Sequence, residues 1–156
     1  MLILAIDPGE TLGYVLIQLK ECVGGSPTLE VVDADQTRLI VTKQGFNWES
    51  VSDLVLHLVT ADEPDVIVLE DYRVYASKAD VHIGSRVLTS ELIGALCQEA
   101  GVAMTPVVRI PAGRKGRWPP ARLKAKFSSD VEIPTPHAMD ALILALIYAE
   151  DKGWIP

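Results

Sequence analysis

The stretch that decides the fold is LILAIDPGETLGYVLIQL, residues 2–19. Its first half is an apolar run that stops abruptly at Asp7, Pro8 and Gly9, the pattern of a buried strand whose last side chain emerges at the sheet edge. The chain then resumes as GYVLIQL, and a Gly-Gly-Ser-Pro turn leads into TLEVVDADQTRLIV, residues 28–41. These three runs predict a meander of three strands.

A second apolar run ends in the same way. In DVIVLED, residues 65–71, the run VIVL is followed directly by Glu70 and Asp71. In an open α/β sheet ligands gather outside the carboxyl ends of parallel strands, so we expect Asp7 and Glu70 to share one crevice. Asp71 is better interpreted as a surface residue at the strand end.

A third carboxylate stands in TPHAMDALILALIYAEDKG, residues 135–153. Thr135 suits a helix N-cap, Pro136 suits the first helical position, and the apolar run stops before a Lys-Gly pair, so the segment predicts a helix with both ends marked. His137 and Asp140 are three residues apart. They therefore share one face of the first turn, where the positive helix end stabilises a carboxylate and attracts phosphate.

The remaining chain completes an α/β pattern. Residues 47–61 have the apolar spacing of an amphipathic helix, residues 84–100 predict a second helix, and residues 102–110 predict a further strand. Residues 111–134 predict a Pro-rich basic loop. The order β-β-β-α-β-α-β-α predicts a five-stranded mixed sheet, a β1-β2-β3 meander followed by parallel strands, flanked by helices in a single domain of residues 1–156.

Composition indicates a globular protein. Of the 156 residues 49% are hydrophobic, yet no apolar run approaches the roughly 20 residues that span a bilayer. The chain begins with strand-like MLILAID, without a basic lead-in or a small-residue cleavage site, so we expect no secretory signal, no membrane association and a cytoplasmic location. Cys22 and Cys97 lack metal-motif spacing and are expected to be small buried side chains.

The net charge of −7 argues by itself against nucleic-acid binding, but the basic residues are unevenly distributed. Half of the 14 basic residues lie between residues 109 and 129, with no acidic residue among them. They are Arg109, Arg114, Lys115, Arg117, Arg122, Lys124 and Lys126. Such a stretch is either a phosphate-facing patch or a solvated loop. For the first case the candidate DNA contacts are Arg114, Lys115 and Arg117.

Three carboxylates at one sheet edge suit a metal site that hydrolyses phosphodiester bonds, a reaction that two metal ions roughly 3.5 to 4 Å apart promote. Asp7, Glu70 and Asp140 offer the oxygen ligands that Mg²⁺ prefers, and we expect two Mg²⁺ ions, replaceable by Mn²⁺, with Asp7 bridging them from the central strand. His137 either ligates a metal or orients and deprotonates the attacking water. Taken singly, Asp7 before Pro-Gly also fits a turn, and His137 fits an ordinary helix start.

Three motifs together resemble the RuvC-type Holliday junction resolvases of the ribonuclease-H-like superfamily. They are DPGETLGY near the start, a Glu that closes the fourth strand, and HAMD at the start of the last helix. The resemblance covers nearly the whole chain and implies a metal site at Asp7, Glu70, His137 and Asp140. It implies a crossover junction endodeoxyribonuclease, which resolves four-way DNA junctions by paired symmetric nicks and leaves 5′-phosphate and 3′-hydroxyl ends.

The segment after Glu70, YRVYASKADVHIGSR, combines aromatic and basic residues. Such side chains stack on unpaired bases or wedge into a junction centre. The resolvase family is similar in placing an aromatic wedge soon after this Glu, so both tyrosines remain candidates; the alternative is that they pack with wet hydroxyl groups. The candidate DNA contacts here are Tyr72, Arg73, Tyr75 and Lys78.

Two symmetric cuts call for two active sites, so we expect a C2 homodimer. Helix 84–100, with Leu88, Leu92 and Leu96, is the candidate interface unless these leucines cover the sheet. Two other functions stay open: an RNA or RNA/DNA-hybrid nuclease of the same fold, RuvX-like, and a non-catalytic nucleic-acid-binding module. Nothing in the sequence identifies a branch-migration partner.

Overall fold

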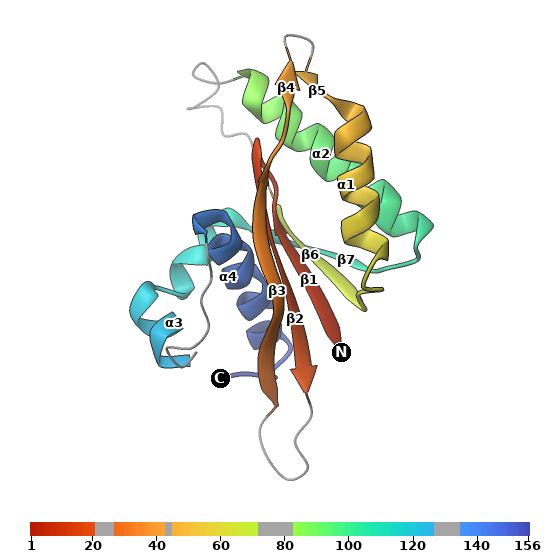
Figure 1. The fold of residues 1–156 in the computed structure, drawn as a ribbon. Coiled ribbons are helices and arrows are strands. Elements are labelled where there is room, and N and C mark those ends of the chain that lie inside the picture. Colours follow the sequence, from red (N-terminus) through yellow and green to blue (C-terminus); the bar gives the residue numbers. More distant parts are fainter. Residues whose placement is uncertain (21–26, 43–44, 72–82, 127–134) are drawn as a thin grey trace.

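The computed structural model describes residues 1–20, 27–42, 45–71, 83–126 and 135–156. Within these residues the main sheet has five strands in the order β3-β2-β1-β6-β7 (Figure 1). They are β1 (Leu2–Asp7), β2 (Thr11–Lys20), β3 (Thr28–Arg38), β6 (Val66–Asp71) and β7 (Val107–Pro111). β1 pairs antiparallel with β2 and parallel with β6, and β6 pairs parallel with β7. The predicted mixed sheet, a meander followed by parallel strands, is confirmed.

The central strands are buried on both faces because their apolar runs are continuous. All residues of β1 after Leu2 are buried, and so are the first four residues of β6. Strands covered on both faces have this continuous hydrophobic pattern, whereas an edge strand alternates. β3 lies at the edge and alternates between half-buried and exposed side chains over most of its length.

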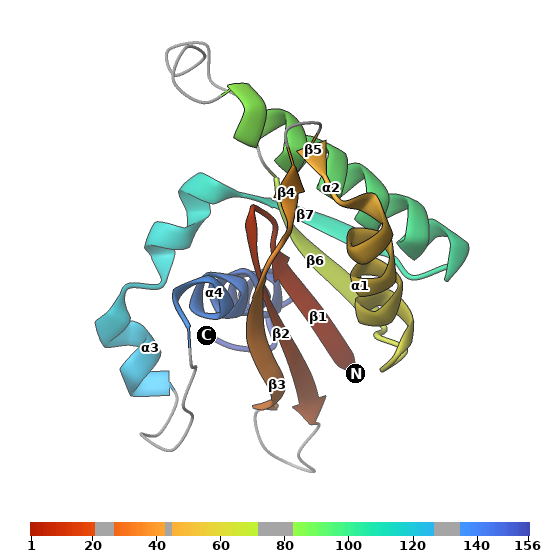
Figure 2. The ribbon, with the colours of Figure 1, turned by 45° about the horizontal axis from the view of Figure 1, so that its top comes forward.

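Three long helices cover the sheet. They are α1 (Trp48–Thr60), α2 (Ile83–Val102) and α4 (Pro136–Asp151), and each corresponds to a predicted helix. Figure 2 shows α4 on one face of the sheet and α1 and α2 together on the other, in agreement with two separate buried clusters. In the part of the chain that the structure describes, no helix combines the length and apolar composition needed to cross a membrane.

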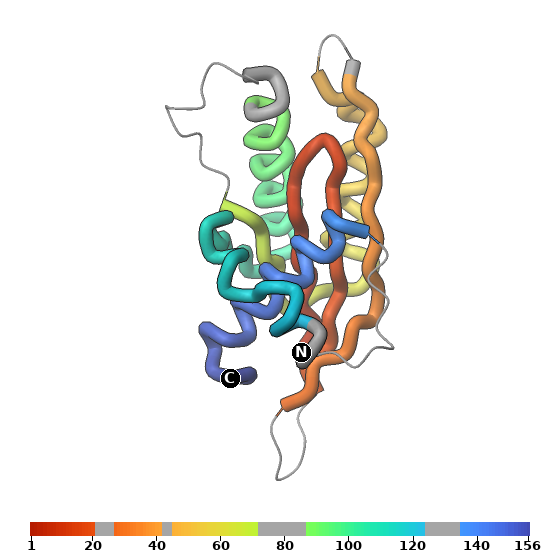
Figure 3. Tube along the Cα trace, turned by 90° about the vertical axis from the view of Figure 1, so that its left-hand side faces the viewer, coloured from red at the N-terminus to blue at the C-terminus, as the bar shows by residue number. Residues whose placement is uncertain are grey.

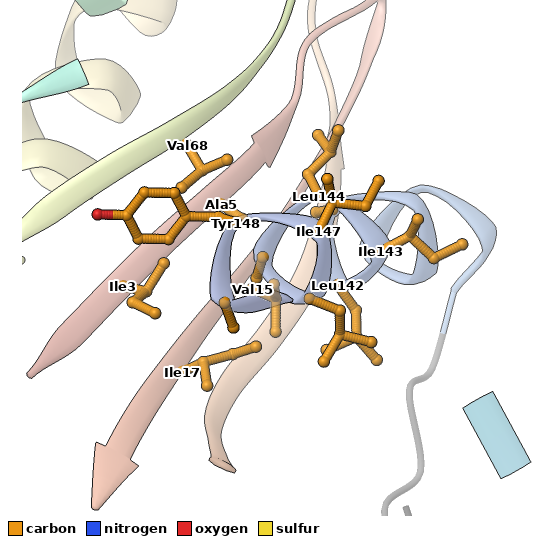
Figure 4. Close-up of a cluster of buried hydrophobic side chains, with 14 of the residues drawn as sticks. Ile3, Ala5, Val15, Ile17, Val68, Leu142, Ile143, Leu144, Ile147 and Tyr148 are labelled. Carbon is orange, nitrogen blue, oxygen red and sulfur yellow. The ribbon is translucent and has the colours of Figure 1, made fainter. Parts of the chain in front are cut away.

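The core under α4 fixes this helix against the strands that lead to the sheet edge. Ile3 of β1 and Val15 of β2 belong to the same buried cluster as Leu144 and Ile147 of the helix (Figure 4), and all four are fully buried. Each large apolar side chain so buried contributes about 1.5–3 kcal/mol. The start of α4 is therefore held beside the end of β1 and the start of β2.

α4 is also buried on its outer side. Every residue from Ala141 to Ala149 is buried, although the sheet covers only one side of the helix. A helix that is apolar all round needs a second cover. Trp118 and Leu123 provide it, because they belong to the same buried cluster as α4.

These two residues lie in a segment that we call the arm, residues 112–126. It contains the 3-10 helix η2 (Ala112–Arg117) and the helix α3 (Pro120–Lys126). Figure 3 shows the arm running across α4. The prediction of a loop over residues 111–134 is thus wrong for its described part, because packing against α4 stabilises short helices that the Pro-rich and Gly-rich composition does not favour.

Two predicted strands are shorter in the structure. The strand predicted over residues 102–110 begins only at Val107, because α2 continues to Val102 and Met104 then adopts a positive φ of 56°. The strand predicted over residues 28–41 ends at Arg38. The chain then forms a small separate pair, β4 (Val41–Thr42) with β5 (Gly45–Phe46).

The leucines of α2 cover the sheet. Leu92 and Leu96 are fully buried and Leu88 is nearly so, in the same cluster as Leu4 and Ile67 of the strands. The expectation that these leucines form a dimer interface is wrong, because their burial is complete within one chain.

Candidate active site

Two carboxylates meet at one edge of the sheet because β1 and β6 are parallel neighbours. Ile6 pairs with Leu69, so Asp7 and Glu70 follow side by side at the carboxyl ends of the two strands. Asp7 is one of the few polar side chains in the described part of the chain that are buried. The structure thus brings Asp7 and Glu70 together at one edge of the sheet, and their role as a metal site stays a prediction.

The start of α4 reaches this edge through a close backbone approach. The Thr135 side chain accepts a hydrogen bond from the Ala138 amide at 3.2 Å, which confirms the predicted cap. Next to it, a Cβ atom at Gly13 would lie 2.2 Å from the carbonyl carbon of His137, so only glycine fits this contact. Because Gly13 pairs with Asp7 in the sheet, the helix start lies directly beside the end of β1.

His137 faces Asp7 as a result. Its Nδ1 atom lies 3.0 Å from Oδ2 of Asp7, and Asp140 follows one turn later on the same helix. The four residues predicted for the metal site are therefore brought to one place. The sequence signal for the close approach is Gly13, the second glycine of DPGETLGY. Sequence reasoning did not assign this residue to the site.

A lysine from the arm completes the cluster. Nζ of Lys115 lies 2.7 Å from Oδ1 of Asp7, 2.5 Å from Oε2 of Glu70 and 3.0 Å from Oδ2 of Asp140. The basic stretch around Lys115 predicts a contact with phosphate for this residue. The structure places its ammonium group between all three carboxylates.

The side chains differ in their access to solvent. Asp7 and Glu70 are 11% and 14% exposed, whereas Asp140 and His137 are 46% and 44% exposed. The strand ends therefore form the floor of the site, and the start of α4 forms a rim that a large substrate can reach.

Burial and close charges shift the ionisation of the floor. Burial opposes ionisation of Asp7, but hydrogen bonding with Glu70 and attraction by Lys115 outweigh it and lower the pKa of Asp7. Burial and the hydrogen bond with Asp7 raise the pKa of Glu70. Burial disfavours the ammonium form of Lys115, yet attraction by Asp7 and Glu70 prevails and raises the pKa of Lys115. A positive charge against an ionised Asp7 is thus the stable state at neutral pH.

The donor set fits a hard divalent cation. Three carboxylates already converge on one positive charge, that of Lys115, and carboxylate oxygens are the ligands that Mg²⁺ prefers. His137 adds a nitrogen that suits Mn²⁺ better than Mg²⁺. Among the residues that the structure describes, no three acidic, histidine or cysteine side chains form a ready-made coordination shell. The fit therefore rests on the chemistry of the donors.

The arginines of the arm pair with acids at the end of α4. Arg114 donates to both carboxylate oxygens of Asp151, at 2.7 and 2.5 Å. Arg117 and Arg122 both pair with Glu150 at 2.9 Å, and Arg122 also lies 4.0 Å from the centre of the Trp118 ring. The basic stretch is thus partly neutralised by acids distant in the sequence, an arrangement that sequence reasoning missed.

Other residues singled out in the sequence lie outside the described residues or away from the carboxylate cluster. The predicted DNA contacts Tyr72, Arg73, Tyr75 and Lys78 lie outside the described residues, as does Cys22. Arg109 points away from the arm, with Nη2 3.3 Å from Sγ of Cys97, a half-buried free thiol on α2.

No protein-family model matches this chain, and no curated protein matches it. Solved structures match over nearly its full length. Thermus thermophilus RuvC in complex with a Holliday junction substrate has a TM-score of 0.74 and 18% identity, covering 99% of this chain and 98% of that chain. The fowlpox virus resolvase, in complex with its substrate Holliday junction DNA, has a TM-score of 0.58 and 14% identity, covering 97% of this chain and 99% of that chain.

The yeast mitochondrial Holliday junction resolvase Ydc2 has a TM-score of 0.60 and 14% identity, covering 97% of this chain and 79% of that chain. At these identities the likeness shows the fold. The resemblance to RuvC-type resolvases, and with it the ribonuclease-H-like fold, is confirmed at that level.

Proposed function

We propose that this chain, which has the fold of RuvC, is a metal-dependent DNA endonuclease that resolves Holliday junctions by paired symmetric nicks. One observation carries the proposal. Asp7, Glu70 and Asp140 come from three separate elements, and all three contact the ammonium group of Lys115 at the sheet edge. A cluster of three carboxylates of this kind suits metal-assisted hydrolysis of a phosphodiester bond. The solved structures of similar fold that contain a junction substrate support the choice of DNA.

Asp7, Glu70 and Asp140 would hold two Mg²⁺ ions, or Mn²⁺ in their place. When bound, these ions neutralise the phosphate oxygens and activate the attacking water. Asp7 would be central among these ligands, because its two oxygens face different partners, Lys115 at Oδ1 and His137 at Oδ2. Glu70 is less exposed than Asp140, so Glu70 would supply a ligand from the floor of the site and Asp140 one from its rim.

His137 is oriented by Asp7 through its Nδ1 atom. The ring is 44% exposed, on the rim where water and substrate arrive. An imidazole fixed by a carboxylate is suited to accept a proton from the attacking water or to complete the ligand set. Either role places His137 in direct contact with the reacting groups.

The described part of the chain contains one such site, so two cuts in one junction would require two chains. We propose a homodimer with twofold symmetry, in which the two sites face strands related by the symmetry of the junction. The products would carry 5′-phosphate and 3′-hydroxyl ends.

A cleavage assay with four substrates tests the proposal. Purified protein and Mg²⁺ are incubated with a four-way DNA junction, linear duplex, single-stranded DNA and an RNA/DNA hybrid, and the ends of the products are mapped. We expect paired nicks in the junction and little cutting of the other substrates. Preferential cutting of the hybrid would indicate an RNA-directed nuclease, and tight junction binding without cutting would indicate a binding module.

A further inference from the structure

Lys115 occupies the centre of the carboxylate cluster. Its Nζ atom is within 3.0 Å of an oxygen of each of Asp7, Glu70 and Asp140, and its side chain is only 18% exposed. Among the described residues that contact these carboxylates, only Lys115 carries a permanent positive charge. The ammonium group therefore holds together three carboxylates that would otherwise repel one another.

The arm delivers Lys115 to this place and keeps it there. Arg114 and Arg117, on either side of it in the chain, pair with Asp151 and Glu150 at the far end of α4. Trp118, one residue beyond Arg117, is buried in the core under the arm. The backbone around Lys115 is thus anchored without help from Asp7, Glu70 or Asp140. The long side chain of Lys115 keeps its rotatable bonds.

An ammonium group and a metal ion cannot share this centre. The nitrogen sits 2.5 to 3.0 Å from the carboxylate oxygens, whereas Mg²⁺ binds oxygens at about 2.0–2.1 Å. Binding the ion with these three ligands requires the oxygens to close on the point that Nζ occupies. The Lys115 ammonium group and the metal ion therefore compete for the same carboxylate oxygens.

We propose that Lys115 is a built-in counter-cation of the catalytic carboxylates and that a divalent metal ion binds by displacing its ammonium group. This proposal rests on the metal site of the proposed function. The doubly charged ion gains more from three carboxylates than a single ammonium charge does, so exchange is favourable at sufficient ion concentration. Because the arm is anchored elsewhere, only the side chain of Lys115 has to move.

The exchange sets a threshold for metal binding. The apparent affinity of a ligand falls by the fraction of molecules in the competent state, so an ammonium group that fills the site nine tenths of the time weakens metal binding by about tenfold. Without metal, Lys115 partly neutralises the three carboxylates. With metal bound, the Lys115 side chain is released to the edge of the site.

Chemical labelling of the wild-type protein tests the displacement. A brief pulse of an amine-acylating reagent, with and without saturating Mn²⁺, is followed by mass spectrometry of each lysine. We expect labelling of Lys115 to rise severalfold with Mn²⁺, whereas Lys152, which lies over the Tyr148 ring at the other end of α4, should not change. Unchanged or reduced labelling of Lys115 at metal saturation would overturn the exchange.

Metal titration of variants gives an independent measure. In calorimetric titrations with Mn²⁺, Lys115→Met should bind about tenfold more tightly than wild type. Lys152→Met removes the same charge far from the carboxylates and should bind like wild type. Equal affinities of Lys115→Met and wild type, with metal bound in both, would overturn the exchange and leave the proposed nuclease intact. Failure of both proteins to bind Mn²⁺ would instead overturn the metal chemistry of the proposed function.

Discussion

The two oxygens of Asp7 have different partners, and this asymmetry distinguishes Asp7 from the other acids of the site. Oδ1 accepts from Lys115 at 2.7 Å and Oδ2 lies 3.0 Å from Nδ1 of His137. Asp7 is also the most buried of the three carboxylates. A buried carboxylate engaged on both oxygens is already oriented before any ligand arrives, so its loss should affect chemistry more than binding.

Replacing Asp7 by asparagine should lower junction cleavage by about 100-fold or more, because the charge that holds the reacting groups is lost. Junction affinity should stay unchanged or rise, since a negative charge near the phosphates is removed. Cleavage and gel-shift assays on one preparation measure both. Asp71→Asn, at the next strand-end acid, is the matched control and should cut normally. Cleavage by Asp7→Asn above about a tenth of wild type would exclude the bridging role.

At the scale of elements, the position of α4 depends on the absence of a side chain from β2. A Cβ at Gly13 would lie 2.2 and 2.3 Å from the backbone carbon and oxygen of His137. Backbone atoms of a buried helix cannot give way as a flexible side chain would. Gly13 therefore sets the distance between the helix start and the sheet edge.

Gly13→Ala should destabilise the protein by about 1–3 kcal/mol through overpacking and should also lower cleavage, because His137 and Asp140 move away from Asp7. Urea unfolding measures the first effect. Gly94→Ala is the matched control: it lies within α2 with nothing within 4 Å of the added methyl group, and it should stabilise the fold by about 0.5–1 kcal/mol. Equal stability of Gly13→Ala and wild type would refute the packing argument.

The ion pair between Arg114 of the arm and Asp151 of α4, which we call the clamp, should depend on pH. The hydrogen bonds from Arg114, which outweigh burial, lower the pKa of Asp151. A group whose pKa is lower in the folded state stabilises that state above its unfolded pKa, and the stabilisation disappears as the pH falls through the folded pKa. The clamp should therefore be complete at neutral pH and weaken below about pH 4.

Asp151→Asn should cost roughly 0.5–1 kcal/mol at pH 7, a small value because both partners are about a third or more exposed. The difference from wild type in thermal unfolding should shrink as the pH is lowered towards 3. A double-mutant cycle with Arg114→Gln isolates the pair. A difference that is the same at pH 7 and pH 3 would show that Asp151 acts by some other contact.

At the scale of the whole molecule, the proposed pair of cuts requires an interface that α2 leucines cannot form. Other large apolar side chains of α1 and α2 remain exposed, among them Trp48, Leu56 and Val87. Exposed apolar residues on neighbouring helices are a usual feature of interfaces between subunits. The homodimer stays a proposal that cleavage products can test.

Mixed dimers of wild type and Asp7→Asn subunits should cut only one of the two strands. On a plasmid with an extruded cruciform, the wild type should give linear product, because both strands are cut within one complex. The mixed dimer should give nicked circles. Linear product from mixed dimers at the wild-type rate would show that one site makes both cuts.

Local pattern was sufficient for the strand-end carboxylates. The apolar runs that end in Asp7 and Glu70 predict both strands, and a Thr-Pro start with a Lys-Gly end predicts α4. Parallel pairing then places Asp7 beside Glu70 without further information. The single-domain organisation, the metal ions and the DNA contacts after Glu70 stay predictions.

The sequence by itself determined the five strands of the main sheet, the three long helices and the acids at the strand ends, because these depend on periodicity and on residues a few positions apart. Only the tertiary structure decided the role of the arm. Lys115 is 108 positions from Asp7, and Arg114 is 37 positions from Asp151. Composition marks the arm as a basic loop, but burial of α4 on both sides requires a cover, and that cover brings Lys115 among the carboxylates. Contacts of this kind depend on packing between distant segments, which no local pattern encodes.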